Sequence, residues 1–140
     1  MKTFKEFLNE RSALVSKIIL PKVTKEQLRD MVLNGEDINT VDYSDVTDMR
    51  YMFHACSSLE EIPHLDTSKV TNMRYMFDKC SSLKEVPHLD TSKVTDMEGM
   101  FDRCSDLEYL EEPMDFVNYE WNKDKHPNIF KKYPELFKGK

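Results

Sequence analysis

The chain has 140 residues, of which 39% are hydrophobic and 33% charged, with only 3 glycines and 6 prolines. This composition predicts one ordered domain with an apolar core and excludes a largely disordered chain. The net charge of −6 is concentrated in residues 38–110, which carry 14 acidic and 7 basic side chains, so repulsion from phosphate groups disfavours a nucleic-acid partner.

Residues 1–20 predict an amphipathic helix that Pro21 ends. Charged residues, among them Lys5 and Glu6, interrupt its apolar positions, so this segment does not have the continuous apolar run of a secretion signal. Nowhere does the sequence reach the roughly 20 consecutive apolar residues that cross a bilayer. We therefore expect a cytoplasmic protein without a membrane role.

The opening sequence MKTFKEFLNE resembles the N-terminal segments of proteins of T4-like bacteriophages. Among these are capsid-targeting peptides, which are cut after a Leu/Ile-x-Glu site, and Leu8-Asn9-Glu10 fits such a site. The resemblance implies a phage-encoded protein that acts in the host cell cytoplasm or is packaged in the virion. The alternative interpretation is a plain helix that docks on the rest of the chain.

A second helix is predicted after Thr24, because Thr24 and Gln27 have the spacing of a capping box. Asn34-Gly35 is a typical helix stop. The apolar face of this helix would be formed by Leu28, Met31 and Val32. We assign residues 1–37 to N-terminal helices that cap the middle of the chain.

Residues 38–61, 62–85 and 86–109 align without a gap at a period of 24 residues. The units share the pattern D-x-S-x-V-T-x-M-x-x-M-F-x-x-C-S-x-L. A unit this short cannot bury its own apolar face, but stacked units can bury it for one another. The sequence therefore predicts a solenoid of three units.

Within each unit the serine of the pattern predicts the N-cap of a short helix that starts near residues 45, 69 and 93. Valine, the first methionine, phenylalanine and cysteine would share one buried helix face, with the second methionine at its edge (Met52, Met76 and Met100). After the cysteine, the run S-x-L-x-x-[IVL] predicts a brief strand. The fold class expected is α/β, with strand-turn-helix units and a small parallel sheet.

The string LDTSKVTNMRYMFDKCSSLKEV resembles the repeats of BspA-type leucine-rich-repeat proteins, which are abundant among mycoplasma and other bacterial surface proteins. The resemblance covers about residues 28–110. It implies a leucine-rich-repeat-type solenoid with repeated surfaces for recognition, and it brings no shared catalytic residue. The chain has only three full units and no recognisable anchor, so we expect protein binding rather than surface adhesion.

Residues 110–140 lose the repeat pattern and are rich in aromatic residues. Large apolar side chains are usually buried, so we expect this segment to fold over the last unit as a C-terminal cap. An exposed aromatic binding site is the alternative. The three segments, 1–37, 38–109 and 110–140, would form one globular domain.

Three cysteines occupy one column of the repeat, Cys56, Cys80 and Cys104. They have no CxxC partner and are surrounded by apolar residues, so we expect small buried side chains rather than zinc ligands. Their odd number, without a recognisable export signal, indicates reduced thiols. We expect no metal, no cofactor and no small-molecule ligand.

His64 and His88 also share a column, beside Asp66 and Asp90. Such a ladder could hold a cation or perform acid–base chemistry, which would make the chain a hydrolase or a metal-dependent enzyme. Thr40 replaces the histidine in the first unit, and the aspartates are readily explained as turn and cap residues. We therefore expect a protein that is not an enzyme.

The remaining candidates are exposed positions beside the predicted helix face, which combine aromatic and arginine side chains typical of binding hot spots. They are Arg50, Tyr51, Arg74, Tyr75 and Glu98. We expect a non-catalytic protein-interaction module, encoded by a bacteriophage, that binds a host or virion protein through these residues. A structural virion component directed by its N-terminal helix is the second hypothesis, and an ordinary solvated surface is the alternative for the residues themselves.

Overall fold

The computed structural model describes residues 3–6, 19–111 and 114–137. Its named elements are helix α2 (Lys25–Leu33), 3-10 helix η1 (Ile38–Thr40), strands β1 (Glu85–Val86) and β2 (Tyr109–Leu110), helix α3 (Pro127–Lys132) and 3-10 helix η2 (Pro134–Phe137). Of the helix predicted over residues 1–20, the parts at 1–2 and 7–18 lie outside the described residues. No helix in the described part of the chain is both long and apolar enough to span a membrane.

Helix α2 begins and ends where its sequence predicts. The Thr24 side chain accepts a hydrogen bond from the Gln27 N–H at 3.2 Å, and the Gln27 side chain accepts one from the Thr24 N–H at 2.9 Å. Gly35 follows the helix with a φ of 71°, a left-handed conformation that favours glycine. Leu28 and Val32 are buried, so the helix covers the first repeated unit with its apolar face.

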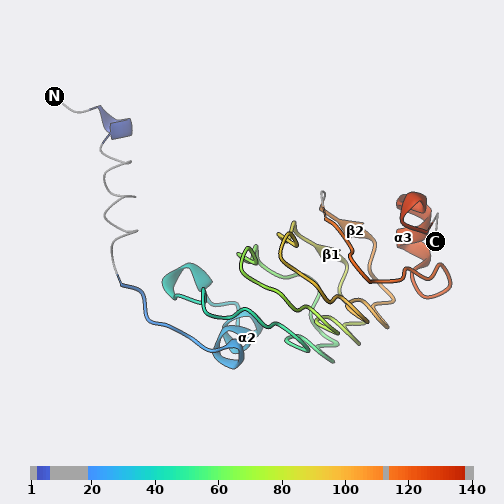
Figure 1. Cartoon of the computed structure of the whole chain (residues 1–140), viewed down its shortest axis with the longest axis horizontal. Coiled ribbons are helices and arrows are strands. Elements are labelled where there is room, and N and C mark those ends of the chain that lie inside the picture. The colour runs from blue at the N-terminus through green and yellow to red at the C-terminus, as the bar shows by residue number, and fades with distance from the viewer. Residues whose placement is uncertain (1–2, 7–18, 112–113, 138–140) are drawn as a thin grey trace.

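The three repeated units lie side by side and in register along the chain, between α2 at one end and α3 at the other (Figure 1). Every second backbone N–H of residues 49–53 donates to a carbonyl of the next unit. The pairs are Met49 to Asn72, Tyr51 to Arg74 and Phe53 to Met76, at 2.9–3.0 Å, and the pairs one unit later are Met73 to Asp96, Tyr75 to Glu98 and Phe77 to Met100, at 2.8–2.9 Å.

The short helices predicted from residues 45, 69 and 93 are not present. Residues 45–56, 69–80 and 93–104 are all described, and they form successive turns instead. In the first unit the Met52 N–H donates to the Met49 carbonyl, and the Cys56 N–H donates to the Phe53 carbonyl. Between these turns Tyr51 has a φ of 57°, which an α-helix excludes. The apolar spacing of three and four residues fits both a helix and a chain of turns, but here the intervening N–H groups bond to the next unit.

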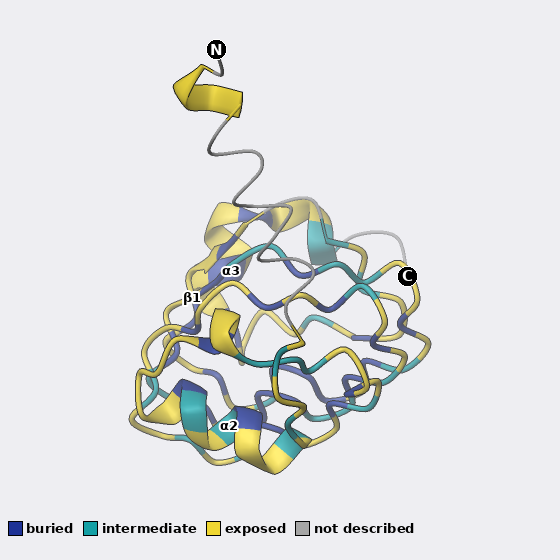
Figure 2. Ribbon diagram, turned by 90° about the vertical axis from the view of Figure 1, so that its left-hand side faces the viewer, coloured by how far each residue is buried: buried dark blue, intermediate teal, exposed yellow. Residues whose placement is uncertain are grey.

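The core consists of columns of identical side chains. Phe53, Phe77 and Phe101 are fully buried and stack with ring centroids 5.6 Å apart. The second methionines, Met52, Met76 and Met100, are also buried, with exposed fractions of 1%, 0% and 0%, so their predicted position at an edge is wrong. The error follows from the helix assumption, since the turns direct this methionine inward. Figure 2, a view turned by 90°, shows buried residues alternating with exposed ones along the coils.

Strands β1 and β2 occur where the S-x-L-x-x-[IVL] runs of the second and third units end, whereas the strand predicted for the first unit, at residues 57–62, is not formed. They pair in parallel, with Glu85 opposite Tyr109 and Val86 opposite Leu110. Each strand has one exposed and one buried residue, because successive side chains of a strand point to opposite faces. The small sheet thus has the same 24-residue register as the rest of the repeat.

Residues 114–137 lie against the last unit. The Asn118 side-chain oxygen accepts a hydrogen bond from the Met97 N–H, at the position where Met49 and Met73 donate to a carbonyl of the following unit. The Tyr133 hydroxyl accepts from the Leu110 N–H at 3.3 Å and donates to the Leu110 carbonyl at 3.2 Å. The Trp121 ring stacks on Phe101 at 5.5 Å. Side chains here take the place of backbone groups that a fourth unit would supply.

Candidate protein-interaction face

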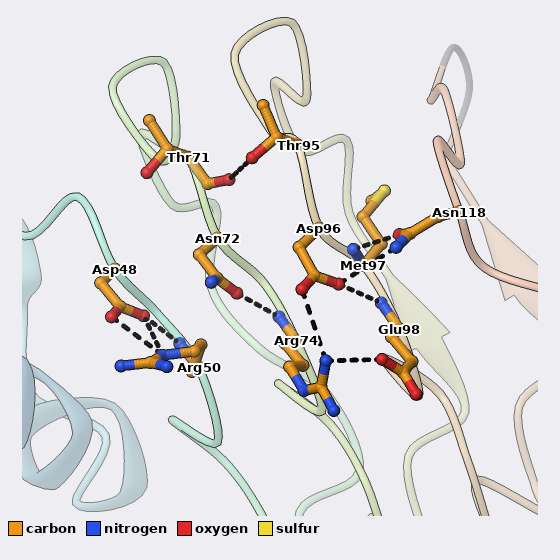
Figure 3. A network of polar contacts seen from close by, with 10 residues as sticks. All are labelled: Asp48, Arg50, Thr71, Asn72, Arg74, Thr95, Asp96, Met97, Glu98 and Asn118. Atoms are coloured by element: carbon orange, nitrogen blue, oxygen red, sulfur yellow. Dashed lines mark hydrogen bonds and ion pairs between the residues drawn. The ribbon is translucent and has the colours of Figure 1, made fainter.

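The five candidate residues lie on one face, which we call the tyrosine face: Arg50, Tyr51, Arg74, Tyr75 and Glu98. A turn positions each of its segments. Asp48, Asn72 and Asp96 occupy one column, and each side-chain oxygen accepts a hydrogen bond from the N–H two residues later, at 3.0, 2.9 and 3.0 Å (Figure 3). Such short polar side chains hold tight turns by bonding to their own backbone.

The residues after these turns have a left-handed backbone. The φ angles are 57° at Tyr51, 53° at Tyr75 and 65° at Gly99. For a tyrosine this conformation is unusual, and the surrounding bonds between units hold it in place. Tyr51 keeps 49% of its surface exposed, whereas Tyr75 is half-buried between its neighbours.

The two tyrosine rings stack on one another, with centroids 5.3 Å apart and planes inclined by 13°. The Tyr75 ring in turn covers Gly99, where a Cβ atom would come within 2.0 Å of a ring carbon. Gly99 is therefore buried, although it shares a column with the exposed Tyr51. The aromatic column ends at this glycine.

Carboxylates hold both arginines of the face (Figure 3). The Arg50 Nε lies 3.0 Å from Asp48 Oδ2 in the same unit. Arg74 reaches the next unit, where its Nη1 contacts the Glu98 carboxylate and lies 3.6 Å from Asp96 Oδ2. Its guanidinium carbon is 5.3 Å from the centroid of the Tyr75 ring. Exposed ion pairs of this kind add little stability, so their main effect is to orient the guanidinium groups.

The electrostatics of the face favour the protonated form of its central phenol. The Glu98 carboxylate, followed by partial burial, raises the pKa of the Tyr75 hydroxyl above its ordinary value. An ordinary tyrosine is already protonated at neutral pH, so this hydroxyl is a hydrogen-bond donor with or without the shift. Asp96 is the opposite case, because hydrogen bonds from the Glu98 N–H and the Asn118 side chain lower the pKa of its carboxyl.

A buried charge that we did not identify from the sequence links the three units. The Asp78 side chain is only 3% exposed. Arg103 of the third unit donates to both its oxygens, at 3.2 and 3.0 Å, and His54 Nδ1 of the first unit lies 3.2 Å away. The sequence offered one indication of this buried charge. Asp78 directly follows a phenylalanine of the repeated column, at a position that is histidine in the first unit.

In the ladder of histidines and aspartates, the two aspartates hold turns. Asp66 and Asp90 each accept hydrogen bonds from the N–H and the hydroxyl of the serine two residues later, at 2.6–3.1 Å. These bonds, the hydroxyl first, lower the pKa of both carboxyls. His64 is exposed and His88 half-buried. Among the described residues no group of three potential ligands could hold a metal ion.

The three cysteines differ in their surroundings. Cys80 and Cys104 are buried, and each thiol donates to the carbonyl of a phenylalanine in the preceding unit at 3.0 Å. Burial raises the pKa of Cys80 to about 12 and that of Cys104 further. Cys56 is half-buried, and its sulfur lies 3.7 Å from the Arg29 guanidinium. The column thus contributes hydrogen bonds between units, a role that apolar packing alone did not suggest.

Comparisons with known proteins give a family but no described relative. A search of curated proteins and one of solved structures produced no significant match. Residues 23–133 match a family described as "Mycoplasma protein of unknown function, DUF285". These residues include α2, all three repeated units and α3. Because the match covers most of the chain, the protein belongs to this mycoplasma-associated DUF285 family.

Proposed function

We propose that the protein is a non-catalytic module that binds another protein through the tyrosine face. The observation that carries this proposal is the partly exposed stack of Tyr51 on Tyr75, with the Arg74 guanidinium near the Tyr75 ring and Arg50 next to Tyr51 in the chain. Tyrosine and arginine are the residue types that most often dominate the energy of protein interfaces.

The arrangement is suited to binding because it is rigid before a partner arrives. Stacking fixes the two rings, and ion pairs with Asp48 and Glu98 fix the guanidinium groups. Side chains that are already ordered lose little conformational entropy on association. The polar ends of both tyrosines and arginines remain available for hydrogen bonds to a partner.

We further propose that the units form a short leucine-rich-repeat-type solenoid of the BspA kind. Hydrogen bonds at a spacing of 23 to 24 residues and the column of stacked phenylalanines support this interpretation. The resemblance of residues 1–10 to T4-like phage proteins favours a phage-encoded accessory protein. Its partner would then be a host protein in the cytoplasm or a protein of the virion.

The proposal is tested by capture of partners from host-cell extract on immobilised protein, followed by affinity measurement with each purified partner. Tyr51→Ala/Tyr75→Ala should weaken binding at least about tenfold, as loss of a hot spot does. The matched control is Tyr109→Ala, because Tyr109 is 40% exposed but lies outside the tyrosine face. Equal binding by the double variant and wild type would refute the choice of face.

A second candidate function is that of a packaged virion component. The observation that favours it is the potential cleavage site Leu8-Asn9-Glu10, which lies outside the described residues. Mass spectrometry of purified particles tests it. A chain that begins at Arg11 inside particles would support packaging, and particles without the protein would rule it out.

A further inference from the structure

A hollow of about 530 Å³ lies where the aromatic column of the tyrosine face ends. Gly99 lines it in place of a third tyrosine, and the rings of Tyr75 and Trp121 line it as well. Three carboxylate residues also line the hollow, Glu98, Asp102 and Glu120, against a single cationic residue, Lys125. We call this hollow the end pocket.

The repeat itself indicates what the end pocket could hold. Asp78, one unit earlier than Asp102, receives two hydrogen bonds from Arg103, which lies 25 residues later. The residue 25 positions after Asp102 is Pro127, which has no charge to offer. Among the residues that the structure describes, Asp102 forms no ion pair. Beside Asp102 lie the Tyr119 hydroxyl and the His126 ring, and no arginine among the described residues pairs with it as Arg103 pairs with Asp78.

The walls of the end pocket suit the same cation. A guanidinium is attracted to the faces of tyrosine and tryptophan rings as well as to carboxylates. Within this protein the Arg74 guanidinium already lies 5.3 Å from the Tyr75 ring while it contacts Glu98. Asp102 and Glu120 supply two further carboxylates, and Lys125 opposes them with one positive charge.

We propose that the end pocket binds an arginine side chain from a basic segment of the partner protein, with Asp102 as its principal acceptor. This inference rests on the proposed function, because it names the kind of partner that meets the tyrosine face. It also agrees with the acidic excess of residues 38–110, which favours a basic partner surface.

The test uses the full chain and the peptide acetyl-Gly-Arg-Gly-amide as the probe. Trp121 is the single tryptophan, so its fluorescence reports directly on the end pocket. We expect a saturable change with this peptide. A matched peptide that contains citrulline should give no change up to about 10 mM, a concentration high enough to detect weak binding. Asp102→Asn should weaken binding about tenfold, because it removes a charge-assisted pair. Lys125→Met should strengthen binding, and Glu61→Gln, an exposed acidic residue outside the pocket, should leave it unchanged.

Unfolding curves for each variant show whether its fold is intact, and Glu120→Gln provides a second substitution if Asp102→Asn is unstable. Equal affinity for the arginine and citrulline peptides would overturn the proposal, as would a folded Asp102→Asn with wild-type affinity. Those results would leave the proposed function standing if Tyr51→Ala/Tyr75→Ala still loses its partner. Failure of that double variant to lose the partner would refute the proposed function independently of the peptide titration.

Discussion

Replacement of Phe77 by alanine should be the most destructive single change in the core. Phe77 is fully buried and stacks on Phe53 and on Phe101, with both centroid distances 5.6 Å. Truncation of a buried phenylalanine to alanine costs roughly 3–5 kcal/mol. Because stacked ring pairs add about 0.5–1.5 kcal/mol each, we expect a loss in the upper half of that range, about 4–5 kcal/mol. Such a loss approaches the whole stability of many domains, which is roughly 5–15 kcal/mol.

The assay is urea unfolding at equilibrium, followed by Trp121 fluorescence and by circular dichroism. Phe77→Leu keeps most of the volume and should lose roughly 1–2 kcal/mol. Tyr51→Ala is the matched control, since Tyr51 is an aromatic residue of the same stack of units but 49% exposed, and it should lose less than about 1 kcal/mol. If Phe77→Ala lost no more than Tyr51→Ala, the stacked core would be refuted.

Three further predictions concern buried polar groups. Asp78→Asn should lower the free energy of unfolding by about 1.5–3 kcal/mol in urea titrations, because it weakens the two charged hydrogen bonds from Arg103. An unchanged midpoint would contradict this. Burial lowers the pKa of His126 from its ordinary value of 6.5, so the unfolded chain binds the proton more readily. The stability that neutral His126 allows is therefore fully present above about pH 6.5 and decreases as the pH falls toward the folded-state pKa. Thermal unfolding measured at about pH 7.5 and 5.5 tests this. The melting temperature should fall less between these two pH values in His126→Gln than in wild type. In the native protein a thiol reagent should modify Cys56 well before Cys80 and Cys104, because Cys56 is half-buried and the other two are buried. Peptide mass spectrometry measures the modification of each cysteine. Equal rates of modification would count against the burial of Cys80 and Cys104.

The repeat in the sequence predicted which residues are equivalent, but not the backbone that carries them. Valine, methionine and phenylalanine recur at spacings of three and four, which a helix and a series of turns share. The helix prediction failed because the N–H groups of Tyr51 and Phe53 bond to the next unit, and a pattern within one unit contains no information on that partner. The burial of Met52 was missed for the same reason.

The five residues of the tyrosine face were chosen for their expected exposure and their chemistry, and the structure brings them together. What the sequence could not indicate is how they contact one another, such as the stacking of Tyr51 on Tyr75 across 24 positions. The burial of Gly99 is equally a tertiary effect, since the covering ring belongs to the preceding unit. Asn118 was missed because a side-chain oxygen that replaces a backbone carbonyl has no sequence pattern of its own.

Amide hydrogen exchange of the second unit, measured by NMR, tests the register of the units most directly. Slow exchange is expected at Met73, Tyr75 and Phe77, whose N–H groups donate to carbonyls 23 residues later. The Arg74 N–H, which bonds only to the half-exposed side chain of Asn72, should exchange faster than its two neighbours. Protection of the Arg74 N–H as strong as that of Met73 and Tyr75, as in a helix, or uniformly fast exchange would contradict the stacking of these units.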